Sequence, residues 1–147
     1  LGAGIKTKVL GTLTPYVLLA EDHPLAQRSS IARADLIDQP MILFDGIPNV
    51  DHTLSLFKQT GTSPQVRYRS ASFELVRAMV GRGLGFAILH TLPAGDQTYD
   101  GKPVVMRPIE GGVSASRVVL ASRADTEESC LSENLADLCR EMFEHEI

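Results

Sequence analysis

The segment from Gln65 to Leu89 constrains the fold of this 147-residue chain more than any other part of the sequence. Gln65 to Arg69 alternates polar and apolar side chains, as a half-exposed strand does. A stretch with apolar residues at helical spacing follows, and Gly81 and Gly83 end it. Leu84 to Leu89 is then a strand expected to be buried on both faces. A strand, a helix and a strand in this order predict a right-handed parallel crossover, and therefore an α/β fold.

The remaining elements follow from apolar patterning and turn residues. Further strands are expected at 16–20, 41–44, 104–106 and 117–122, and the uninterrupted apolar run Tyr16–Ala20 is typical of a parallel sheet. Asp51 is the expected cap of a helix that continues to Thr60 and ends at Gly61. Ser70 or Ser72 caps the helix inside the crossover, with a buried face expected to comprise Leu75, Val76, Met79 and Val80.

The clearest helix pattern lies at the end of the chain. Thr126 is the expected cap, followed by acidic residues in the first turn. The apolar stripe of this helix comprises Leu131, Leu135, Leu138 and Met142. Cys130 and Cys139 fall nine positions apart in the same helix, which places them on opposite faces and predicts two reduced thiols.

Charge and motif spacing narrow the possible functions. A net charge of −4 argues against a nucleic-acid-binding surface, which needs clustered Lys and Arg. The glycines of Gly81-Arg82-Gly83-Leu84-Gly85 close a helix and open a strand, the reverse of the order in a dinucleotide fingerprint. No histidine has a partner at metal-ligand spacing, so neither a metal nor a cofactor is expected, and His52 is expected to be an exposed helix residue. Arg67, Arg69 and Arg77 form a basic group, which is usually a solvated face and less often an anion clamp for a carboxylate ligand.

The strongest candidate binding site is the loop from Phe44 to Val50, between an expected strand and an expected helix. Asp45 and Asn49 are its polar residues, and the positive end of the following helix suits an anionic group. The alternative is a plain strand–helix connection. Ser72 and Phe73 form a second helix start of this kind. His90 follows a buried strand, where an α/β sheet presents its ligand crevice.

Several segments together resemble the effector-binding domain of LysR-type transcriptional regulators. The resemblance is carried by Pro15-Tyr16-Val17-Leu18-Leu19-Ala20-Glu21-Asp22-His23-Pro24-Leu25-Ala26 and by Val80-Gly81-Arg82-Gly83-Leu84-Gly85 before an apolar strand. Further segments in the family's order are 30–40, 44–50, Gly61 with Pro64, 72–80 and 117–123. The resemblance implies an α/β, periplasmic-binding-protein-like (type II) architecture with two Rossmann-like lobes and an effector in the cleft between them.

Carried over by position, the resemblance assigns three regions. Residues 1–20 would be the end of lobe I and the first hinge strand, residues 21–116 lobe II, and residues 117–147 the second hinge strand and a helix returning to lobe I. The hinge residues would be Tyr16, Val17, Leu18, Val118, Val119 and Leu120. The effector-binding residues would be Phe44, Asp45, Pro48, Asn49, Val50, Ser72, Phe73 and His90. First-lobe contacts would lie upstream of Leu1.

The leading hypothesis is therefore the effector sensor of a transcriptional regulator, with no catalytic residues. Its partners would be a small organic acid, DNA through an N-terminal helix-turn-helix, and further copies of the chain, as a dimer of this fragment or a tetramer of full-length family members. Reduced cysteines and no recognisable leader favour the cytoplasm. The alternative is a solute-binding protein of a transport system, and a third possibility is an enzyme that uses His90 or Asp45. Leu1–Ile5 and the uncovered leucine stripe predict dimerisation or partial disorder.

Overall fold

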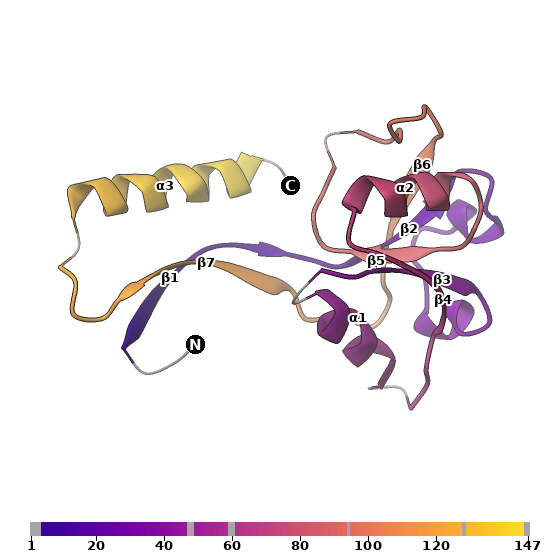
Figure 1. Ribbon diagram of the computed structural model, residues 1–147, viewed down its shortest axis with the longest axis horizontal. Coiled ribbons are helices and arrows are strands. Elements are labelled where there is room, and N and C mark those ends of the chain that lie inside the picture. Colours follow the sequence, from indigo (N-terminus) through magenta and orange to yellow (C-terminus); the bar gives the residue numbers. More distant parts are fainter. Residues whose placement is uncertain (1–3, 47–48, 59–60, 94, 128, 146–147) are drawn as a thin grey trace. The chain divides into compact units, whose positions relative to one another are not determined.

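The computed structural model describes residues 4–46, 49–58, 61–93, 95–127 and 129–145. The chain divides into two compact units (Figure 1). Unit 1 combines residues 1–14 with residues 115–147, and unit 2 comprises residues 15–114. Pro48, one of the predicted site residues, lies outside the described residues.

The described residues of unit 1 form two antiparallel strands and one helix. Strand β1 (Ile5–Leu13) pairs with β7 (Ser116–Arg123), and the register shifts between Val9 and Gly11. Helix α3 (Cys130–His145) packs on β1. Its cap is Ser129, whose Oγ accepts from the Ser132 N–H at 3.2 Å. The prediction of Thr126 as the cap was wrong, because a turn intervenes and the helix begins four residues later.

Helix α3 packs on β1 through a face that differs from its leucine stripe. Ala136 is buried, and Ser132, Cys139 and Phe143 are half-buried. Phe143 lies over Gly11, where an added Cβ would be 2.5 Å from the ring. The leucine stripe is exposed, with fractions of 82% for Leu131, 50% for Leu135, 57% for Leu138 and 57% for Met142.

The centre of unit 2 is strand β2 (Tyr16–Ala20), in which every residue is buried. It lies between β5 (Ala87–Leu89) and β6 (Val104–Pro108), and both pairings are antiparallel. The prediction of parallel neighbours for Tyr16–Ala20 was therefore wrong. A strand covered by side chains on both faces reads as a continuous apolar run whatever the direction of its neighbours.

The predicted parallel crossover is present in unit 2. Strand β3 (Pro40–Phe44) pairs in parallel with β4 (Gln65–Ser70). The chain entering β5 joins the other edge of β3 through a parallel bridge between Met41 and Phe86. Helix α2 (Phe73–Gly81) connects β4 to β5, so these two strands run in the same direction on either side of β3.

Two helices cover opposite faces of these strands (Figure 1). Helix α1 (Asn49–Lys58) buries Leu56 and Phe57 in one core cluster, to which β2 contributes Val17 and Leu19. Helix α2 buries Val76 and Val80 in the other cluster. The alternation of side chains along β2 supplies both cores, because successive residues of a strand point to opposite faces.

The helix ends match the turn chemistry in part. Ser72 caps α2 by accepting from the Leu75 N–H at 3.3 Å, and Gly61 has a φ of 69°, both as predicted. Asp51 is not a cap, because α1 begins at Asn49 and Asp51 lies in its first turn. Leu75 is 52% exposed rather than buried. Two 3-10 turns, η1 (Pro24–Gln27) and η2 (Arg33–Leu36), complete unit 2.

Candidate functional site

The candidate site lies in unit 2, where α1 begins and β5 ends. Strand β3 ends at Phe44, and the loop after it leads to Asn49, the first residue of α1. The Asn49 N–H donates to the Gly46 carbonyl at 2.7 Å, which holds the loop against the helix. His90 directly follows β5. Because β3 and β5 are parallel neighbours, their carboxyl ends lie at the same edge, where α/β sheets place ligand sites.

Asn49 and His90 are joined by a hydrogen bond. The Oδ1 atom of Asn49 lies 2.8 Å from Nδ1 of His90. The Nδ2 atom of Asn49 donates to the Phe44 carbonyl at 3.1 Å. Both residues were predicted as separate site residues, and the structure brings them together.

A second histidine completes this cluster. The ring of His52 meets the ring of His90 edge to face, with centroids 5.4 Å apart and planes at 79°. His52 Nδ1 and His90 Nε2 are both buried and have no hydrogen-bond partner among the described residues. Burial lowers the pKa of His90, and the neighbouring His52 lowers it further. The ring of His90 is therefore neutral at pH 7.

His52 is the residue that the sequence analysis missed. Its side chain is half-buried, whereas a solvated helix residue was expected. The spacing could have indicated it, because residues three apart on a helix share one face, and His52 follows Asn49 by three.

The other predicted residues lie in three different environments. The ring of Phe44 meets that of Phe73 edge to face, with centroids 6.0 Å apart, which links the end of β3 to the start of α2. Val50 packs against the core cluster on the α1 side. Asp45 is ion-paired with Arg69 at 3.1 Å. Ser72 is exposed, and its hydroxyl caps α2.

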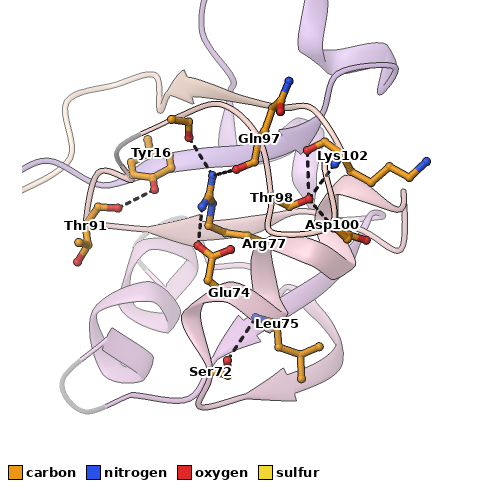
Figure 2. Close-up of polar contacts among 11 residues, drawn as sticks. Tyr16, Ser72, Glu74, Leu75, Arg77, Thr91, Gln97, Thr98, Asp100 and Lys102 are labelled. Carbon is orange, nitrogen blue, oxygen red and sulfur yellow. Dashed lines mark hydrogen bonds and ion pairs between the residues drawn. The ribbon is translucent and has the colours of Figure 1, made fainter.

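A buried arginine holds the segment after this site (Figure 2). Arg77 is 5% exposed, and it donates to the carbonyls of Gly95 and Gln97 at 2.8 Å each. It also pairs with Glu74, one turn earlier on α2. The sequence interpretation of Arg77 as part of a solvated basic face was wrong, because its guanidinium is buried and ties Gly95 and Gln97 to the helix.

Tyr16 and Thr98 hold the same segment at two further points (Figure 2). The Tyr16 hydroxyl donates to the Thr91 carbonyl at 2.8 Å, and burial raises the pKa of this phenol. The Thr98 hydroxyl accepts from the Lys102 N–H at 3.0 Å. Since Thr91 follows His90, these contacts also restrain the chain beside the candidate site.

The predicted hinge residues lie in different units. Tyr16, Val17 and Leu18 belong to β2 in unit 2, and Val118, Val119 and Leu120 belong to β7 in unit 1. The chain passes from one unit to the other at residues 14–15 and 114–115. The predicted boundaries at 20 and 116 and the hinge role stay predictions.

The described residues contain no group of three or more His, Cys, Asp or Glu side chains placed to hold a metal ion. Across the same residues, none of the helices combines the length and the apolar character needed to cross a membrane. Cys130 is an exposed free thiol and Cys139 a half-buried one.

Residues 2–144 match the family described as the LysR substrate binding domain. The chain is 31% identical over 134 residues to the uncharacterized HTH-type transcriptional regulator YvbU of Bacillus subtilis, covering 86% of this chain and 42% of that protein. It is 26% identical over 125 residues to the HTH-type transcriptional regulator TtuA of Agrobacterium vitis, covering 83% and 41%. The chain thus spans about two fifths of the length of these curated relatives.

Solved structures agree with this match. HinK, a LysR family transcriptional regulator from Pseudomonas aeruginosa, is 35% identical with a TM-score of 0.90, over 97% of this chain and 50% of that one. The C-terminal domain of a probable LysR family regulator from Rhodococcus sp. RHA1 is 37% identical with a TM-score of 0.85, over 95% and 69%. The BenM effector binding domain with its effector benzoate, 22% identical with a TM-score of 0.81 over 99% and 66%, shares the fold.

These matches confirm the predicted fold class, which is the α/β, periplasmic-binding-protein-like (type II) fold. The curated relatives named above are transcriptional regulators, which argues against the alternative of a transport solute-binding protein. A family match over residues 2–144, together with the ordered motifs of the sequence, identifies the chain as a member of the LysR substrate binding domain family.

Proposed function

We propose that this chain is the effector-sensing part of a LysR-type transcriptional regulator, and that it binds a small organic acid where α1 begins and β5 ends. The observation that carries the proposal is the Asn49–His90 hydrogen bond at 2.8 Å, beside two buried ring nitrogens that have no hydrogen-bond partner in the part of the chain that the structure describes. Buried polar atoms in proteins are nearly always paired, so unpaired ones at a sheet edge suit a ligand.

The surroundings favour a ligand with an acidic group and an apolar body. The positive end of the α1 dipole lies at Asn49 and stabilises a negative charge there. Phe44 and Phe73 supply half-buried aromatic surface beside it. BenM has benzoate as its effector, a molecule of this general kind. Ser72 stays a weaker candidate, because its hydroxyl already caps α2.

The contacts of Asp45 and His90, the two side chains that could act as acid or base in an enzyme, fit a sensing role better than catalysis. Asp45 is paired with Arg69, and His90 uses Nδ1 to hold Asn49. Neither arrangement joins a nucleophile to a base, which is the usual signature of a hydrolytic or transfer enzyme. The relatives named HTH-type transcriptional regulators support a role in which a separate DNA-reading domain responds to the effector. We expect such a regulator to act in the cytoplasm.

We propose further that α3 pairs with a second copy of this chain. Leu131, Leu135, Leu138 and Met142 are spaced by four, three and four residues, which is the period of paired helices. Burying each of these side chains contributes about 1.5–3 kcal/mol. An exposed stripe of this size on an ordered helix is typical of an interface.

A thermal-shift screen of small organic and aromatic carboxylic acids tests the sensing function, with Asn49→Ala as the control. A ligand that raises the melting temperature of the parent and leaves that of Asn49→Ala unchanged supports the site. Stabilisation that persists in Asn49→Ala argues for a site elsewhere on the chain, and the absence of any stabilising acid contradicts the proposal.

A further inference from the structure

The orientation of the Asn49 amide fixes the proton on His90. Nδ2 of Asn49 lies 3.1 Å from the Phe44 carbonyl, which can only accept, so this end of the amide must be the NH₂ group. The other end is then the Oδ1 atom, which also can only accept. Since Oδ1 lies 2.8 Å from Nδ1 of His90, Nδ1 must carry the proton.

The second ring nitrogen of His90 therefore has a lone pair and no hydrogen. Burial and the neighbouring His52 keep the pKa of His90 below its ordinary value, so the ring is neutral near pH 7 and Nε2 acts as an acceptor. His90 is 9% exposed, and no donor among the described residues reaches Nε2. A buried acceptor without a partner is costly, and a bound group that donates to it removes that cost.

The lone pair on Nε2 of His90 lies beside the proposed ligand site. The His90 ring is held by Asn49, the first residue of α1, and it lies against His52 in the same helical turn. A neutral acceptor does not attract a carboxylate, which the α1 terminus stabilises instead. A ligand that satisfies both features carries an acidic group and, beside it, a hydrogen-bond donor.

We propose that the effector donates a hydrogen bond, from a hydroxyl or similar group, to Nε2 of His90, and that the site thereby selects hydroxylated organic acids over analogues that lack the hydroxyl. The inference rests on the proposed function and adds the chemical class of the effector. His90 is then the residue that determines specificity, because an acid without a donor leaves Nε2 unpaired in the complex.

Calorimetric titration of the 147-residue chain with matched pairs of acids tests the proposal. The pairs are mandelate with phenylacetate, lactate with propionate, and 3-hydroxybenzoate with benzoate. For the pair that fits the site, the hydroxylated member is expected to bind on the order of tenfold more tightly, the ratio that one hydrogen bond supports. In His90→Asn, whose amide can still donate to Asn49 but has no atom in place of Nε2, the preference for the hydroxylated member should disappear.

Nitrogen-15 NMR of His90 tests the same inference without a ligand. The expected spectrum shows a protonated Nδ1 and an unprotonated Nε2 at pH 7, and the opposite tautomer or a doubly protonated ring overturns the proposal. Equal binding of both members of every pair, or a preference that survives in His90→Asn, also overturns it and leaves the sensing function standing. Binding of none of the acids overturns the sensing function, and the inference with it.

Discussion

Replacement of Gly85 by alanine is expected to separate β3 from β5, the two strands whose ends position Asn49 and His90. Gly85 has a φ of 150°, which a residue with a Cβ rarely adopts. A Cβ at this position would lie 2.1 Å from the carbonyl oxygen of Pro40 and 2.9 Å from its carbonyl carbon. The obstacle is backbone, so no side-chain rotation relieves the contact.

The expected loss of stability follows from the hydrogen bonds between the start of β3 and the residue before β5. The Pro40 carbonyl accepts from the Phe86 N–H at 3.0 Å, and the Ile42 N–H donates to the Phe86 carbonyl at 2.8 Å. Moving Pro40 away weakens both bonds, each worth about 1 kcal/mol net. Retaining the glycine conformation with alanine costs about 1–3 kcal/mol more. We therefore expect Gly85→Ala to lower the free energy of unfolding by about 3–5 kcal/mol.

Gly83 provides the matched control. Its φ is 72°, but no atom lies within 4 Å of an added Cβ, so Gly83→Ala carries only the left-handed backbone cost of about 1–2 kcal/mol. Urea unfolding followed by circular dichroism measures both variants, and amide exchange at Ile42 and Phe86 reports on the junction itself. A loss for Gly85→Ala within 1 kcal/mol of the loss for Gly83→Ala, or unchanged exchange at both amides, would refute the reasoning.

Three further predictions concern charge, pH and association. Arg77→Met should lower the free energy of unfolding by about 3–5 kcal/mol, because Glu74 and two loop carbonyls lose a buried partner. Limited proteolysis should then cleave within residues 91–102, and Arg77→Lys should recover part of the lost stability. The lowered pKa of His90 means that the unfolded state binds more protons, so stability should fall as the pH drops below about 6.5, and urea melts of His90→Asn should show a smaller fall. Leu135→Asp should lower self-association in sedimentation velocity experiments, while Glu133→Asp should leave it unchanged.

Two helix ends were predictable from local turn chemistry, and the neighbours of β2 were not. Ser72 as a cap and Gly61 as a terminator depend on a few adjacent residues, and both are confirmed. The antiparallel setting of Tyr16–Ala20 depends on β5 and β6, which come about 70 and 85 residues later in the chain. Burial on both faces gives the same apolar run in either setting, so composition alone does not distinguish them.

In the candidate site, too, contacts between residues far apart in the sequence were not predictable. Asn49 and His90 were each predicted from their place next to a strand or a helix start, but their contact requires β3 and β5 to be neighbours. Arg77 was misassigned because an arginine in an amphipathic helix is usually solvated, and the carbonyls that hold it lie 18 and 20 residues later. Predictions from sequence therefore identified the residues of this site better than their partners.

Helix α3 shows where a correct pattern led to an incomplete conclusion. The leucine spacing predicted a helix with one apolar face, and the helix is present. However, the face that packs on β1 is the one with Ala136 and Phe143, and the Phe143 ring lies over Gly11, where the absence of a side chain leaves room for it. The larger leucines stay outside, although their burial is worth more per residue than that of alanine. Because α3 packs on its own strand through another face, its leucine stripe stays exposed, which is the physical reason for expecting association with a partner through α3.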